Sequence, residues 1–136
     1  MNDIVIDKVQ SIHRSIERAR EEYHLAGVNL RNDYSRQDAA ILNITRACEL
    51  TIDLANYVIK THKIGIPTSS AESFSLLARK QIIPAQIEEK MSSMVGFRNI
   101  AVHEYQKLRI EIVEAVIKIG LDDLLAFSDC IVKEFS

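Results

Sequence analysis

Apolar side chains recur at alternating steps of four and three residues along two long stretches of the chain. In the first stretch, residues 3–24, the recurring positions are Val5, Val9, Ile12, Ile16, Ala19 and Tyr23. In the second stretch, which runs to about His62, they are Ala40, Ile44, Ala47, Thr51, Leu54 and Val58. This spacing puts the side chains on one side of an α-helix. The pattern therefore predicts two long helices, each burying one face.

Residues that cap or interrupt helices predict where these two helices begin and end. The segment 25–34 contains a glycine together with asparagines and an aspartate, a composition typical of a loop. Ser35 is followed three residues later by Asp38, which is close to a capping box, so we expect the second helix to begin there. Gly65 and Pro67 should stop this helix.

Three further helices follow. Ser69 and Glu72 form a full capping box, which predicts the start of a short helix. Pro84 fits the first turn of a fourth helix, where the missing N–H has no consequence. After a polar break, a broad apolar face predicts a last helix over roughly residues 110–134, including Ile112. A glycine in its interior, Gly120, argues against one straight rod.

The order of these segments predicts an all-α, up-and-down bundle of four main helices and one short helix, in a single domain spanning residues 1–136. The chain has only 4 glycines and 2 prolines, too few for the turns of a many-stranded fold. The alternating spacing of the first two helices also suits a homodimer seam, although a bundle core is the simpler interpretation.

Composition and charge narrow the possible location and binding partners of the protein. No apolar run is long enough to cross a membrane, and the first residues lack the layout of a signal peptide, so we expect a cytosolic protein without a membrane partner. The formal net charge of −2 argues against a protein that coats nucleic acid without specificity. Cys48 and Cys130 lie within apolar helical patterns and are interpreted as small buried hydrophobes. We find no histidine and cysteine spacing that predicts a metal site.

The end of the fourth helix concentrates reactive side chains, with Arg98, His103 and Tyr105 inside eight residues. On an ideal helix Arg98 and Tyr105 share a face, whereas His103 points about 140° away from Arg98. The two groups can meet on one substrate atom only if the helix ends near residue 102 or if a second copy of the chain supplies one of them. The simpler interpretation is a polar helix end with a solvated arginine and a capping histidine.

The spacing Arg98-x4-His103-x-Tyr105 resembles the R-x(4–6)-H-x-Y signature of the HEPN superfamily, and specifically of its HepT-like toxins. The stretches 43–56 and 65–70 are also similar to that family. The likeness covers nearly the whole chain, and the motif segment shows no departure from the pattern.

This resemblance implies an all-α homodimer that cleaves RNA with neither metal nor cofactor, at a site built from two motif copies at the dimer seam. Arg98 would bind the scissile phosphate, His103 would act as general base or general acid, and Asn99 is a secondary candidate near the phosphate. Tyr105 would be the residue that a cognate minimal nucleotidyltransferase, the antitoxin, modifies with AMP. The resemblance predicts RNA, and not DNA, as the substrate.

A polar line on the second helix contains Glu49 and Asp53. A solvated face with paired charges is one interpretation of this line. The alternative follows from the resemblance, because Glu49 and Asp53 fall in a block shared with the family and would orient the side chains of Arg98 and His103 from beneath.

Two other functions compete with the ribonuclease. One is a non-catalytic HEPN-type subunit of a nucleotidyltransferase, for substrate binding or regulation, in which Arg98 binds a nucleotide phosphate. Such a subunit should bind nucleotide after His103→Ala and should never cleave RNA. The other is a helical assembly protein whose motif is only a helix end, for which Arg98→Ala and His103→Ala should change nothing.

Overall fold

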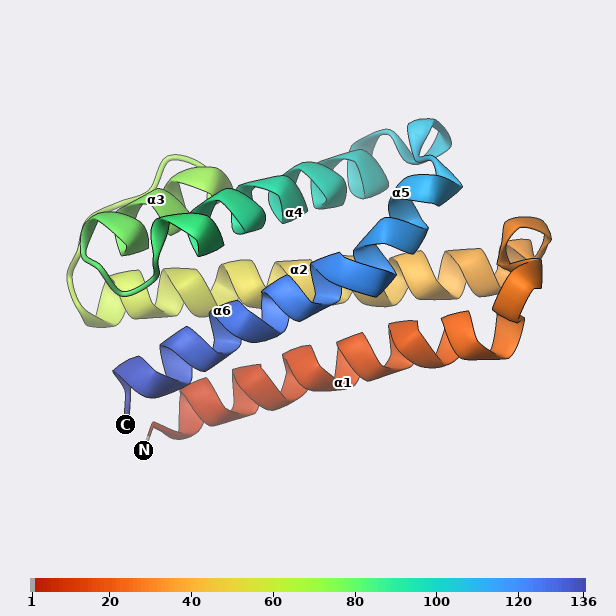
Figure 1. Ribbon diagram of the computed structural model, residues 1–136. Helices are drawn as coiled ribbons and strands as arrows, with labels where there is room; N and C mark the ends of the chain where they lie inside the picture. The colour runs from red at the N-terminus through yellow and green to blue at the C-terminus, as the bar shows by residue number, and fades with distance from the viewer. Residues whose placement is uncertain (1) are drawn as a thin grey trace.

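Two long antiparallel helices lie side by side along the length of the molecule (Figure 1). The computed structural model describes residues 2–136, and these two helices are α1, Asp3–Ala26, and α2, Tyr34–Thr61. All the recurring positions of α2 are buried. In α1 they are buried except Val9 and Tyr23, which are half-buried against the core. Each helix therefore turns its apolar face inward, as the spacing predicts.

The connection between α1 and α2 corrects one predicted boundary. Gly27, at φ +55°, begins a short 3-10 helix, η1, Gly27–Asn32. Asp33 rather than Ser35 caps α2, because the carboxylate of Asp33 accepts a hydrogen bond from the Arg36 amide at 3.1 Å. Ser35 already lies inside the first helical turn, so it does not occupy the N-cap position.

The end of α2 also depends on a residue other than the predicted ones. Lys63 adopts a left-handed backbone with φ +52°, and the amide of Ile64 donates to the carbonyl of Ile59 at 3.0 Å. This arrangement reverses the chain and gives a partner to one of the free carbonyls at the helix end. Gly65 and Pro67 follow after the helix has already ended.

The short helix α3, Ser70–Arg79, begins as its capping pattern predicts, since the Glu72 amide donates to Ser69 Oγ at 3.1 Å. The fourth helix, α4, Ala85–His103, starts directly after Pro84, which is the N-cap rather than the first helical residue. Both helices pack on α2 (Figure 1).

The last predicted helix is interrupted next to its internal glycine. In chain order the remaining elements are the 3-10 turn η2, Tyr105–Lys107; α5, Ile110–Ala115; the π-helical turn η3, Val116–Gly120; and α6, Leu121–Glu134. A Cβ atom on Gly120 would lie 3.0 Å from Met94 Sδ, so the glycine lets this turn approach α4 closely. The helix α6 then packs against α1, α2 and α4 (Figure 1).

The core joins the helices from all parts of the chain. Phe127 of α6 meets Phe74 of α3 edge to face, with ring centroids 5.2 Å apart. Cys48 is buried and Cys130 is half-buried against the core, and both are free thiols. No helix within residues 2–136 is both long and apolar enough to cross a membrane. The predicted all-α bundle is confirmed, with its last main helix broken at η3.

Candidate active site at the end of α4

Arg98 of α4 lies with its guanidinium beside Glu49 of α2. Arg98 Nε and Glu49 Oε1 are 3.7 Å apart, close enough for an ion pair but too far for a good hydrogen bond. Arg98 Nη1 donates to Asn99 Oδ1 at 2.8 Å. The Nε atom is shielded from solvent and has no hydrogen-bond partner within residues 2–136. The guanidinium is therefore held between two side chains while most of its donors remain available to a ligand.

His103 is the last residue of α4, and its side chain is exposed. Within the part of the chain that the structure describes, His103 makes no side-chain hydrogen bond or ion pair. The Glu104 amide donates to the Ile100 carbonyl at 2.8 Å, so the helix is intact through His103. Arg98 and His103 are therefore five positions apart on one helix, which sets the two side chains about 140° apart around the axis. One copy of α4 does not direct both groups at the same atom.

Tyr105 leaves the axis of α4 and lies against α2. The chain after Glu104 forms η2, and Tyr105 Oη donates a hydrogen bond to Asp38 Oδ1. Burial of the ring, and then the bond to Asp38, raise the pKa of Tyr105 to about 12. The phenol is consequently protonated at neutral pH. Because α4 ends at His103, Tyr105 does not continue the Arg98 face that an unbroken helix would give it.

Asp38 contacts Tyr105 but was not predicted from the sequence as a site residue. Its position in the sequence suggests only a capping acid, and it lies 67 positions before Tyr105 in the chain. A hollow of about 390 Å³ lies beside this hydrogen bond and is lined mainly by apolar side chains of α2 and α4, such as Leu42 and Val102. No local pattern signals this pairing, because it depends on how η2 folds back onto α2.

The two carboxylates predicted to support the site differ in their contacts. Glu49 forms the ion pair with Arg98. Asp53, one helical turn further along α2, is exposed and makes no ion pair within residues 2–136; it lines a hollow that also includes Arg46. Beneath the arginine, burial raises the pKa of the Cys48 thiol to about 12, so this cysteine is protonated and unreactive.

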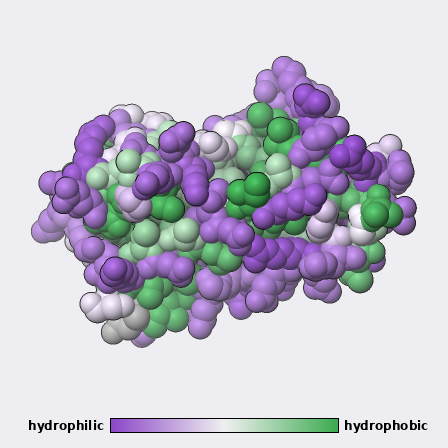
Figure 2. All heavy atoms as spheres, in the orientation of Figure 1, coloured by the Kyte–Doolittle hydropathy of each residue, from purple (hydrophilic) through white to green (hydrophobic). Residues whose placement is uncertain are grey.

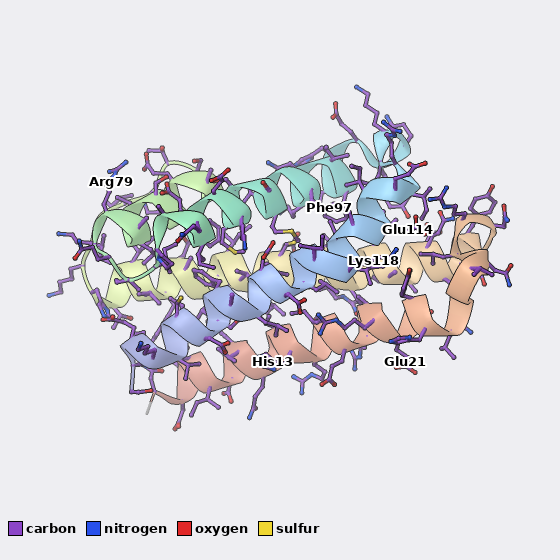
Figure 3. All side chains as sticks on the ribbon, in the orientation of Figure 1. His13, Glu21, Arg79, Phe97, Glu114 and Lys118 are labelled. Atoms are coloured by element: carbon purple, nitrogen blue, oxygen red, sulfur yellow. The ribbon has the colours of Figure 1, made fainter. Side chains whose placement is uncertain are left out.

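An apolar groove of about 670 Å³ runs beside the site, between α4 and the α5–η3 segment. Three isoleucines that line it are exposed, by 38% for Ile100, 48% for Ile112 and 65% for Ile119. Figure 2 shows apolar atoms gathered on this face. Burial of Ile112 is predicted from its helical face, and this is wrong because no described element covers that side of α5. Phe97 is buried between α4 and α5, so it is a core residue (Figure 3).

The charged side chains around the motif are largely exposed. Lys107 Nζ lies 3.3 Å from Glu104 Oε1, and Arg109 Nε lies 3.7 Å from Glu111 Oε2. Within residues 2–136 no group of three histidine, cysteine, aspartate or glutamate side chains is placed to hold a metal ion. The chemical groups at the end of α4 are thus a guanidinium, an imidazole, a phenol and the carboxylates beside them.

Residues 12–131 match the family described as "Ribonuclease HepT-like". The chain belongs to the HepT-like ribonuclease family. It is 42% identical over 134 residues to "mRNA nuclease HepT" of Shewanella oneidensis, an alignment that covers 98% of this chain and 100% of that protein. The predicted family and the predicted class of enzyme, a ribonuclease, are confirmed.

Solved structures give the same assignment for the HepT-like fold. The structure of tri-AMPylated Shewanella oneidensis HEPN toxin in complex with MNT antitoxin superposes with a TM-score of 0.92 at 42% identity, covering 98% of this chain and 99% of that chain. A toxin–antitoxin structure with AMP-PNP also matches with a TM-score of 0.92, at 41% identity and with coverage of 97% and 99%. The cytosolic protein YutE of Bacillus subtilis shares the fold alone, with a TM-score of 0.72 at 14% identity over 92% of this chain and 88% of that chain.

Proposed function

We propose that this protein is the ribonuclease toxin of a cytosolic toxin–antitoxin pair, and that a cognate minimal nucleotidyltransferase silences it by attaching AMP to Tyr105. The observation that carries the proposal is the Arg98, His103 and Tyr105 motif at the end of α4, in a chain of the HepT-like ribonuclease family. The relative from Shewanella oneidensis is named an mRNA nuclease, and the matching solved structure is a tri-AMPylated toxin bound to its antitoxin. Messenger RNA is accordingly the substrate that we assign to this chain.

The active unit is a homodimer in which the ends of two α4 helices face each other. Helix geometry supports this, because Arg98 and His103 of one copy point about 140° apart, whereas residues of opposed copies can flank one phosphate. The unpartnered Nε of Arg98 supports it as well, since a buried donor without an acceptor is unfavourable unless a ligand or partner supplies one. The exposed isoleucines of the groove give the two copies an apolar surface to bury beside the site.

Cleavage follows from the chemistry of these groups. One His103 imidazole takes the proton of the ribose 2′-hydroxyl, which attacks the adjacent phosphorus. The 5′-oxygen of the next nucleotide leaves and takes a proton from the His103 imidazolium of the other copy. The guanidinium of Arg98 donates to the non-bridging oxygens, where negative charge builds in the transition state. The products are a 2′,3′-cyclic phosphate and a 5′-hydroxyl.

The remaining site residues act around Arg98. Glu49 orients the guanidinium through the 3.7 Å ion pair, and Asn99 holds Nη1 through the 2.8 Å hydrogen bond. Asp53 makes no hydrogen bond or ion pair with Arg98 among the described residues, so we assign it only a long-range electrostatic role. AMP on Tyr105 would place a bulky anion two residues from His103, where an RNA phosphate must bind, and would repel the substrate.

The test is cleavage of messenger RNA in excess EDTA by purified protein whose Tyr105 is shown by intact mass to be unmodified. We expect cleavage by the wild type, and a loss of at least about 100-fold in His103→Ala and Arg98→Ala. The exposed Glu21 of α1 supplies a matched control, since Glu21→Gln alters charge away from α4 (Figure 3). Absence of cleavage by the unmodified wild type, or full activity of His103→Ala, would contradict the proposal.

A further inference from the structure

Tyr105 makes one side-chain hydrogen bond within the described residues, and its acceptor comes from a different helix. Tyr105 Oη donates to Asp38 Oδ1 on α2. The other charged side chain nearest in sequence, Glu104, is paired with Lys107 at 3.3 Å. Asp38 has no ion pair within residues 2–136, and its side chain is exposed. The Asp38 carboxylate, which has no ion pair among the described residues, therefore accepts a hydrogen bond from the hydroxyl group that the proposed modification must use.

The phenol of Tyr105 is a weak nucleophile as it stands. With its pKa at about 12, only roughly one molecule in 10⁵ carries a phenolate at pH 7. Attack by the neutral phenol requires its proton to leave as the new O–P bond forms. A base within hydrogen-bond reach of the reacting oxygen is the usual solution to this problem.

We propose that Asp38 is the catalytic base for modification of Tyr105, so that the toxin supplies part of the active site that silences it. This inference rests on the proposed function. Tyr105 Oη attacks the α-phosphorus of a nucleoside triphosphate held by the partner enzyme. The bond between the α-phosphorus and the bridging oxygen breaks, pyrophosphate leaves, and the phenolic proton passes to Asp38. Since Asp38 is exposed, it then loses this proton to water.

The same geometry confines the role of Asp38 to the first transfer, the one in which the phenol oxygen reacts. Once the phenol oxygen carries AMP, it has no proton to donate to Asp38. The new phosphodiester is negatively charged and lies next to the carboxylate, so the hydrogen bond that anchors η2 to α2 is replaced by repulsion. Modification therefore releases the segment around Tyr105 from α2.

The experiment compares AMP transfer to the wild-type toxin and to three variants by the cognate nucleotidyltransferase with ATP, followed by intact mass. Asp38→Asn keeps an oxygen that can accept the tyrosine hydrogen bond but cannot take the proton. Asp38→Ala removes both functions, and Asp38→Glu restores a carboxylate. Asp129→Asn makes the same change at an exposed carboxylate on α6 and serves as the matched control.

We expect Asp38→Asn and Asp38→Ala to lower the kcat of transfer by about 100-fold, Asp38→Glu to recover part of it, and Asp129→Asn to match the wild type. The KM for the Asp38→Asn toxin should stay unchanged, because the variant keeps the anchoring contact. Transfer at the wild-type rate by Asp38→Asn with loss only in Asp38→Ala would overturn the inference and leave Asp38 as an anchor. If Asp38→Asn does not fold, as judged by its melting temperature, added formate decides with Asp38→Ala: recovery of the kcat of transfer supports the base, and no recovery leaves Asp38 as an anchor.

Failure of the proposed function gives a different result. If the wild-type toxin takes up no AMP, or if Tyr105→Phe is modified as readily as the wild type, the assignment of Tyr105 is wrong. If the wild type is modified at Tyr105 and Asp38→Asn is modified equally fast, the assignment of Tyr105 stands and the role of Asp38 falls.

Discussion

Replacing Glu49 by glutamine tests whether Glu49 orients Arg98, the arginine that we propose binds the RNA phosphate. The variant keeps the size of the side chain and one oxygen facing Arg98 but removes the negative charge. Arg98 Nε and Glu49 Oε1 are 3.7 Å apart, and the Arg98 and Glu49 side chains are 25% and 50% exposed. The contact is therefore partly screened by water, and the perturbation acts on the charge rather than on a hydrogen bond.

The magnitude follows from this geometry. Two unit charges at the 3.7 Å separation attract by roughly 1 kcal/mol in water and by roughly 4.5 kcal/mol at an effective dielectric constant of 20. Because Glu49 is half exposed, the value lies near the lower figure, and exposed ion pairs contribute about 0.2–1 kcal/mol. If Glu49 orients Arg98 for the transition state, Glu49→Gln lowers kcat/KM by about 1.4- to fivefold. Removal of the guanidinium in Arg98→Ala has a far larger effect.

The assay is cleavage of a short RNA under conditions where the rate reports kcat/KM, with Glu21→Gln as the control for the same change of net charge. Raising the salt concentration should bring the ratio between wild type and Glu49→Gln toward one, since salt screens the pair. Cleavage by Glu49→Gln as fast as, or faster than, the wild type would refute the reasoning. Glu49 would then either have no effect on Arg98 or compete with the RNA phosphate for binding to Arg98.

Two other predictions concern the dimer and the response to pH. Ile112→Glu places a charge in the apolar groove, so we expect sedimentation to show a folded monomer and RNA cleavage to fall at least tenfold; a dimeric, active variant would contradict the dimer. For Tyr105, burial and Asp38 raise the pKa from 10.0 to about 12, so the folded state favours the neutral phenol. The stability that this gives is complete below pH 10 and is lost as pH rises through 12. Chemical unfolding of wild type and Tyr105→Phe should therefore diverge over that range, and parallel curves would show that the pair does not stabilise the fold.

Helical segments and their buried faces were predictable because they depend on local periodicity. Every recurring position of α2 is buried, and the interruption next to Gly120 also follows from a local property. The helix ends were predicted less well. Asp33 and Lys63 end up as the capping and chain-reversing residues, since a cap depends on the backbone angles that packing leaves at each helix end.

The sequence by itself determined the motif, the family and the candidate catalytic groups, because Arg98, His103 and Tyr105 are close together in the chain. It also indicated Glu49 as a candidate, and the structure places Glu49 Oε1 3.7 Å from Arg98 Nε. These features need only spacing and residue type to be recognised.

Only the tertiary structure decided which groups lie against the motif. The helix α4 continues through His103, so its two reactive residues diverge, and the chain then turns so that Tyr105 reaches Asp38 across 67 residues of sequence. The same packing leaves Ile112 exposed in the groove beside the site. These relations are set by how α4, η2 and α5 pack against α2, and contacts between distant segments leave no periodic trace in the sequence.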